Sequence, residues 1–219
     1  MGTLKVRVLG ANQPYLPTLE AMQAFTQQRA EDAVDELWVL EHQPVFTLGR
    51  NGQMEHVLAA GEIPVVKVDR GGQVTYHGPG QLVIYLLLDV RRLNLGVREL
   101  VIKIEQAIIK LLASRNLEAA GDREAPGVYV AGKEIAAVGL RVSRGKTYHG
   151  LSLNVDMKLE PFTRINPCGY AGLEVTQCCD LGIDEPLMEL AGELAMLLAQ
   201  ELGYQQIEWL ADYSCIHVN

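Results

Sequence analysis

The chain has 219 residues, and a composition with 48% hydrophobic and 21% charged residues is that of an ordinary globular protein. Its formal net charge of -8 at pH 7 argues against a general affinity for nucleic acid or for an anionic membrane. No segment reaches the roughly 18 to 20 apolar residues of a membrane-spanning helix, and the N-terminus lacks the apolar core of a signal peptide. We therefore expect one cytoplasmic domain over residues 1–219.

The first third of the chain predicts short strands and one helix. Leu4, Val6 and Val8 alternate with basic residues, which is the pattern of a half-buried strand. Thr18 follows Pro17 and is a plausible N-cap for an amphipathic helix that ends near residue 30. Further short strands are expected at 36–41, 45–48 and 64–69.

A glycine-rich segment, residues 70–81, lies between two predicted strands. Its sequence is Arg-Gly-Gly-Gln-Val-Thr-Tyr-His-Gly-Pro-Gly-Gln, a backbone that can turn tightly and approach a ligand closely. The apolar run 82–88 follows at once and fits a central strand that is covered on both faces. Because strands fix both ends of the segment, it is a candidate binding site. An ordinary hairpin with His77 on the surface is the alternative.

The rest of the chain predicts two helices around a β meander. Apolar residues recur at helical spacing over 97–112 and again over 187–202, where Asp184 is the expected N-cap and Gly203 the stop. Between the helices, three β-rich runs separated by turn residues predict antiparallel strands at 127–130, 134–142 and 146–155. Residues 161–177 have no periodicity and are expected to form an ordered loop, and the tail from residue 209 carries no signal.

The candidate nucleophile is a cysteine in this loop. The four cysteines, Cys168, Cys178, Cys179 and Cys215, have no Cys-x-x-Cys spacing, which argues against a zinc site or a disulfide framework. Cys168 lies between a proline and a glycine, whereas a packing cysteine usually lies in an apolar periodic segment. A thiol attacks as its thiolate and gains from a nearby cation or base, for which the candidates are Lys133, His77 and His149. From position alone, however, Lys133 fits a solvated hairpin lysine better, and each histidine fits a loop cap.

Four motifs, taken together and in order, resemble the lipoyl(octanoyl) transferase family. They are residues 70–81, 132–133 with 135–139, 149–155 and 167–169, and the match spans roughly 37–176. The resemblance implies an α/β (α+β) fold with a larger mixed sheet, a smaller sheet and flanking helices, like the catalytic domain of lipoate and biotin protein ligases.

The resemblance also implies an activity. An octanoyl or lipoyl group would pass from acyl carrier protein to a specific lysine of the lipoyl domains of 2-oxoacid dehydrogenase acyltransferase subunits or of the glycine cleavage carrier protein. The cysteine matching Cys168 would carry the acyl group as a thioester, and the lysine matching Lys133 would be its catalytic partner. Conversion of a thioester to an amide runs downhill, so no ATP, other cofactor or metal is expected.

The implied acyl site has a defined lining. Its expected residues are Arg70, Gly71, Gly72, Gln73, Thr75, Tyr76, His77, Val138, Gly139, His149, Gly150 and Leu151. Both protein partners are expected to be acidic, and a steering patch of basic residues is expected from Arg141, Arg144, Lys146 and Arg164.

Three rival interpretations remain open. An ATP-dependent lipoate or biotin protein ligase would share the fold but would activate a free acid and would tolerate loss of Cys168. A cysteine hydrolase would release free acid, and a non-enzymatic acyl-binding protein would never be acylated. Neither of the last two explains all four motifs.

Overall fold

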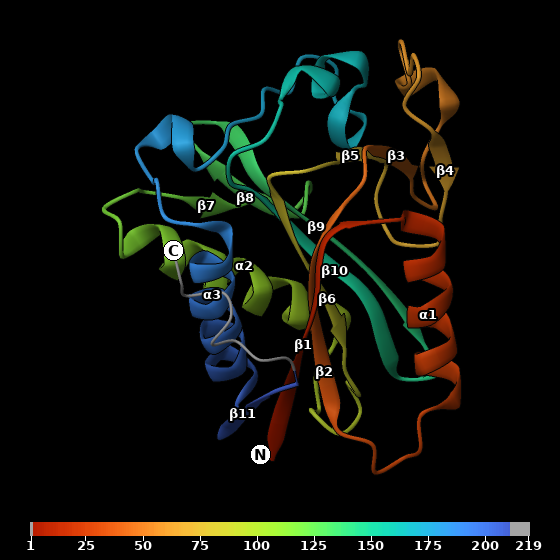
Figure 1. Ribbon diagram of the computed structural model, residues 1–219, viewed down its shortest axis with the longest axis vertical. Coiled ribbons are helices and arrows are strands. Elements are labelled where there is room, and N and C mark those ends of the chain that lie inside the picture. The colour runs from red at the N-terminus through yellow and green to blue at the C-terminus, as the bar shows by residue number, and fades with distance from the viewer. Residues whose placement is uncertain (1, 211–219) are drawn as a thin grey trace.

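The computed structural model describes residues 2–210, which form two β-sheets flanked by helices (Figure 1). The large sheet has eight strands in the order β11-β1-β2-β6-β10-β9-β8-β7, and the small sheet has three in the order β4-β3-β5. This mixed architecture confirms the predicted fold class. None of the helices in this part of the chain is both long and apolar enough to cross a membrane.

The large sheet is mixed, because β1 runs parallel to β2 and β11 while the remaining neighbours are antiparallel. Its strands are β1 (Thr3–Gln13), β2 (Asp35–His42), β6 (Gln81–Leu87), β7 (Ala120–Gly121), β8 (Gly127–Val130), β9 (Lys133–Ser143), β10 (Lys146–Asn154) and β11 (Gln206–Trp209). The predicted meander corresponds to β8, β9 and β10, which pair in sequence order.

Helices cover both faces of the large sheet (Figure 1). They are α1 (Tyr15–Gln28), α2 (Val97–Ala113) and α3 (Leu187–Leu202). In β6, Leu82 and Ile84 pack in the core that contains α2 and α3, whereas Val83 and Tyr85 pack in the core that contains α1. Successive side chains of a strand point to opposite faces, so a strand buried on both faces is apolar throughout. This is why the uninterrupted run predicted a central strand correctly.

The glycine-rich segment is only partly a loop. The small sheet contains β3 (Val45–Leu48), β4 (Val65–Lys67) and β5 (Val74–His77), so the second half of the segment is a strand paired with β3. Phe46 and Tyr76 join Phe162 in a separate core beneath this sheet. Residues 70–73, ahead of β5, remain as the turn that approaches the large sheet.

Both expected N-caps are wrong. The α1 helix begins at Tyr15 after Pro14, and the Thr18 hydroxyl inside the helix donates a hydrogen bond of 2.8 Å to the Pro14 carbonyl. The α3 helix begins after Pro186, not at Asp184. At both places the N-cap residue is a proline, whose fixed φ suits a helix start but whose side chain makes no capping hydrogen bond. Gly203 is the predicted stop of α3, and it ends the helix in the left-handed conformation.

Candidate active site

A cavity of about 390 Å³ lies between the glycine-rich segment, β9, β10 and the loop that carries Cys168. Its lining includes Cys168 and nearly all of the predicted acyl-site residues: Arg70, Gly71, Gly72, Gln73, Thr75, His77, Val138, Gly139, His149, Gly150 and Leu151. Tyr76 is the exception. Its ring lies on the other side of β5, 5.5 Å from the rings of both Phe46 and Phe162 between centroids.

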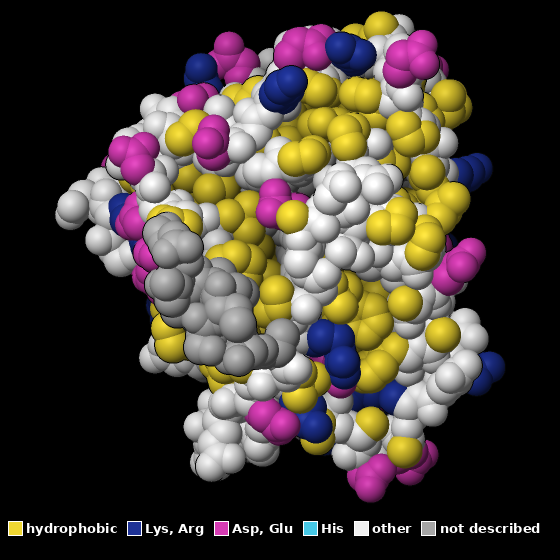
Figure 2. All heavy atoms as spheres, viewed as in Figure 1, with side chains coloured by type: hydrophobic (Ala, Val, Ile, Leu, Met, Phe, Trp, Pro, Cys, Tyr) yellow, Lys and Arg dark blue, Asp and Glu magenta, His cyan; other side chains and the backbone are white. Residues whose placement is uncertain are grey.

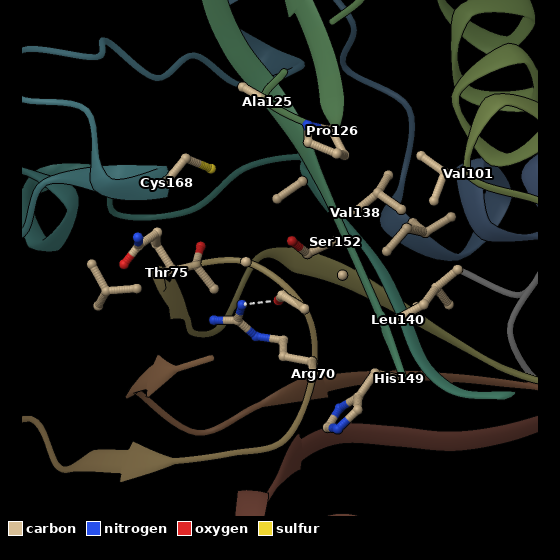
Figure 3. A pocket seen from close by; sticks show the side chains of 18 of the residues that line it. Arg70, Thr75, Val101, Ala125, Pro126, Val138, Leu140, His149, Ser152 and Cys168 are labelled. Carbon is tan, nitrogen blue, oxygen red and sulfur yellow. Dashed lines mark hydrogen bonds between the residues drawn. The ribbon is translucent and has the colours of Figure 1, made fainter. Parts of the chain in front are cut away.

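The cavity has a reactive end and an apolar wall (Figure 3). The Cys168 side chain points inward at one end, and Val101, Val138 and Leu140 form the wall across from it. Val101 comes from α2, and the other two come from β9. Gly150, which lines the cavity, lets β10 lie close to β6, because a Cβ atom there would come within 2.1 Å of the Ile84 carbonyl oxygen.

Arg70 places a buried positive charge at the floor of the cavity. Its side chain is held by hydrogen bonds of 2.9 Å to the Gly71 carbonyl and of 2.7 and 2.9 Å to the carbonyl and hydroxyl of Thr47. Burial lowers its pKa, and interactions with acidic groups that include Cys168 and Glu134 oppose this shift. Arg70 therefore supplies positive potential to the reactive end.

The two predicted histidines pair with groups other than the thiol. His77 Nδ1 lies 2.7 Å from the Gln81 side-chain oxygen, and burial lowers the pKa of His77 to about 3. His149 has a positive φ of 61° and its Nε2 lies 3.0 Å from Asp69 Oδ1. Burial lowers the His149 pKa as well. Both rings are therefore neutral near pH 7 and line the cavity without touching the thiol.

Cys168 is held in a strained turn. Its φ of 54° and ψ of 14° lie in the left-handed region, which costs a non-glycine residue of the order of 1 kcal/mol or more. The turn is closed by hydrogen bonds of 3.0 Å from Gly169 N–H to the Asn166 carbonyl and from Tyr170 N–H to the Pro167 carbonyl. Such strain persists where the surroundings fix it, and it is concentrated at functional sites.

The group beside the thiol is Glu134. The Cys168 S–H donates to its carboxylate, with Sγ at 3.5 Å from Oε2 and 3.7 Å from Oε1. Burial raises the pKa of the Cys168 thiol, and the Glu134 charge raises it further. Burial also raises the pKa of Glu134 to about 7.

Lys133, which the resemblance implied as the catalytic partner of Cys168, pairs with a different residue. Its side chain is about half exposed, and its Nζ pairs with the exposed Glu174 carboxylate at 3.0 Å. Neighbours on a strand point to opposite faces, so β9 directs Lys133 outward and Glu134 inward. The pairing of β8 with β9 skips Ile135, because Val128 is opposite Ala136 while Tyr129 is opposite Glu134. This bulge aims Glu134 at the thiol, as bulges beside active sites commonly do.

Comparison with known proteins identifies the family. The sequence model of the lipoyl protein ligase A/B catalytic domain matches residues 14–199. The chain is 58% identical over 205 residues to the octanoyltransferase of Pseudomonas entomophila (strain L48), covering 94% of this chain and 95% of that protein. It is 57% identical over 208 residues to the octanoyltransferase of Marinobacter nauticus, covering 95% of this chain and 98% of that protein. The chain belongs to the octanoyltransferase family.

Membership of this family confirms the expectation of an acyltransferase that works with octanoyl groups in protein lipoylation. Solved structures agree on the fold. A crystal structure of lipoate-protein ligase A bound with ATP superposes with a TM-score of 0.76 at 14% identity, covering 99% of this chain and 92% of that one. The biotin protein ligase of Aquifex aeolicus superposes with a TM-score of 0.56 at 12% identity, covering 93% of this chain and 70% of that one. At these identities the likeness concerns the fold alone.

The expected basic steering patch is divided: Arg141, Arg144 and Lys146 lie at the turn end of β9 and β10, whereas Arg164 lies in the short helix Glu160–Arg164. Lys146, the first residue of β10, donates to the Arg29 carbonyl at the end of α1, whereas Arg164 pairs with Glu160. On the face shown in Figure 2, Lys and Arg side chains are spread out. Arg164 lies apart from the other three residues because β10 leads the chain away from the β9–β10 turn.

Proposed function

We propose that this enzyme transfers an octanoyl, or lipoyl, group from acyl carrier protein to a specific lysine of a lipoyl domain through a thioester on Cys168. The observation that carries the proposal is the position of the thiol at the end of a cavity with an apolar wall. A nucleophile placed there meets the carbonyl of an acyl chain whose tail lies in the cavity.

The cavity suits a short acyl chain. Its volume of about 390 Å³ is near the lower end of the usual range for ligand pockets. Burial of the seven carbons beyond the octanoyl carbonyl contributes about 5 kcal/mol, at roughly 0.8 kcal/mol per methylene. This binding energy does not depend on the carrier, so it holds the acyl group through both halves of the reaction.

The reaction has two balanced steps. The Cys168 sulfur attacks the thioester carbonyl of the acyl group on the phosphopantetheine arm, and the carrier leaves as its free thiol. The neutral amine of the acceptor lysine then attacks the Cys168 thioester, which forms the amide and returns the Cys168 thiol. Because a thioester is converted to an amide, neither step requires ATP, another cofactor or a metal.

The proposed acceptors are the lipoyl domains of 2-oxoacid dehydrogenase acyltransferase subunits and of the glycine cleavage carrier protein. One structural relative, from Thermoplasma acidophilum, is described as a bi-partite lipoate protein ligase with its E2 lipoyl domain. Its TM-score of 0.73 at 15% identity supports a shared fold on which an acceptor of this kind can act.

A transfer assay distinguishes this proposal from the ligase alternative. The enzyme is incubated with apo lipoyl domain and either octanoyl-acyl carrier protein without ATP, or octanoate with ATP, and the mass of the lipoyl domain is measured. Octanoylation in the first mixture and none in the second supports the proposal. The opposite pattern contradicts it and assigns an ATP-dependent ligase.

A further inference from the structure

We propose that Glu134, rather than Lys133, is the proton-transfer partner of Cys168: its carboxylate takes the thiol proton as Cys168 attacks and returns it to the leaving thiol. The inference rests on the proposed function, because it assigns a role within the same thioester reaction. It starts from the contact between Glu134 and the Cys168 thiol, at 3.5 Å from Oε2 to Sγ.

The backbone fixes Glu134 on both sides. Its N–H donates to the Glu174 carbonyl, and its carbonyl accepts from Thr176 N–H, both at 2.9 Å. The segment that follows the Cys168 turn therefore runs alongside the start of β9, so the carboxylate and the thiol belong to one hydrogen-bonded unit. A base held in this way needs little reorganisation at the moment of proton transfer.

Glu134 is buried, with only 4% of its surface exposed, and it has no ion pair among residues 2–210. Two groups act on its carboxyl, and it acts on a third. Cys168 donates a hydrogen bond to it from its turn, and the Arg70 charge at the cavity floor lowers its pKa. Burial raises the pKa of Tyr129 on β8, and the Glu134 charge raises it further. Burial outweighs the influence of Arg70 and Cys168, so the carboxyl exchanges its proton close to neutral pH, where a general base is most effective.

The proton movements balance in both steps. In the first, the S–H proton moves to Glu134 as the sulfur–carbon bond forms, and the same proton then moves to the departing pantetheine sulfur. In the second, Glu134 accepts a proton from the attacking amine nitrogen and delivers it to the Cys168 sulfur as the thioester breaks. Glu134 thus ends each half-reaction as a carboxylate.

A carboxylate and an ammonium beside the thiol have opposite consequences. An ammonium stabilises the thiolate and lowers the thiol pKa, which makes the cysteine reactive at neutral pH. A carboxylate disfavours the thiolate, so the thiol stays protonated until substrate is present and the base removes the proton during attack. The two assignments therefore differ in the ionisation of the free enzyme as well as in the rate.

The first test follows the acylation of Cys168 by octanoyl-acyl carrier protein, without acceptor, for the wild-type protein and three variants. Glu134→Gln keeps the shape of the side chain but removes the base, so acylation should slow by about 10²- to 10⁴-fold, the usual contribution of general acid–base catalysis. Glu134→Asp should recover part of the rate. Glu174→Gln is the matched control, because it makes the same chemical change at an exposed position on the Lys133 side.

The second test needs no substrate. The rate of Cys168 alkylation by iodoacetamide, measured against pH, reports the thiol pKa. Glu134→Gln should lower this pKa and speed alkylation near pH 8 while it slows acylation. Loss of a merely structural contact would not move the two rates in opposite directions.

The Lys133→Met variant tests whether Lys133 or Glu134 is the proton-transfer partner of Cys168. We expect it to retain acylation within a few-fold of wild type, while Glu134→Gln does not. The inference is overturned if Lys133→Met abolishes acylation and raises the thiol pKa while Glu134→Gln leaves both unchanged. Failure of the proposed function itself looks different: the wild-type protein would then form no octanoyl adduct, whatever the alkylation profiles of the variants.

Discussion

The Glu134 carboxylate lies 3.5 Å from the Cys168 sulfur, although the two residues are 34 positions apart in the chain. Lys133, next to Glu134, points the other way and pairs with Glu174. The thiol therefore faces a buried carboxyl group, and this arrangement affects stability as well as catalysis.

Glu134→Gln should stabilise the protein at alkaline pH. The native pKa of Glu134, about 7, lies above its ordinary value of 4.5, so the folded state holds the proton more tightly than the unfolded state. The resulting stability is present in full below pH 4.5 and is lost as the pH rises through 7. By linkage, the free energy of unfolding falls by about 3 kcal/mol over this range, at about 1.4 kcal/mol per pKa unit. Urea unfolding at pH 5 and pH 8 measures it, and a Glu134→Gln variant with the same pH slope as wild type would contradict it.

Arg70→Met should raise the pKa of Glu134 further, because the Arg70 charge lowers that pKa in the native protein. In a plot of acylation rate against pH, the acidic limb, where the rate rises as Glu134 loses its proton, should move to higher pH. The variant should also lose about 2 to 4 kcal/mol of stability, since the Thr47 carbonyl and hydroxyl lose their buried partner. Arg70→Lys keeps the charge and should leave the limb nearly in place. An unmoved limb in Arg70→Met would refute the proposed electrostatic coupling.

Gly150→Ala should disrupt the cavity wall. Its Cβ atom would lie 2.1 Å from the Ile84 carbonyl oxygen, so β10 and β6 would have to separate. Overpacking of this kind costs about 1 to 3 kcal/mol or more, and octanoyl transfer should fall with it. Gly96→Ala is the control, since nothing lies within 4 Å of its Cβ position. Equal unfolding midpoints for the two variants would show that the close approach is unimportant.

Cys178→Ala should leave acylation intact. Cys178 is fully buried in the core with α2 and α3, and burial raises its thiol pKa to about 12. The variant should lose about 1 kcal/mol of stability for its lost packing, as in other small core truncations. Intact-mass analysis after incubation with octanoyl-acyl carrier protein checks this, and loss of the adduct would make Cys178 a participant.

The elements that the sequence predicts well are those determined by local pattern. The alternating faces of β6, the helical spacing in α2 and α3, and the turns of the β8–β10 meander are all visible in short windows. By contrast, β11 has four residues and is an edge strand that pairs with β1 from the far end of the chain, so nothing local marks it. The remainder of the uninformative tail, residues 211–219, lies outside the described residues.

The sequence predicts which residues line the site, but not which of them contact one another. The motifs identify the cavity lining and the Cys168 loop, but the sequence does not show the bulge at Ile135 that determines which of two adjacent residues, Lys133 or Glu134, faces the thiol. The resemblance implied Tyr76 as part of the cavity lining, together with its neighbours Thr75 and His77. Once Val74–His77 is a strand, alternation sends Tyr76 into the small-sheet core.

The acyl-enzyme itself provides the most direct test. Wild type and Cys168→Ala are incubated with octanoyl-acyl carrier protein, without ATP and without acceptor, and their intact masses are measured. The thioester mechanism predicts one added octanoyl group on the wild-type protein, none on the variant, and loss of the group when apo lipoyl domain is added. An unmodified wild-type protein, or an adduct that persists in Cys168→Ala, would contradict it.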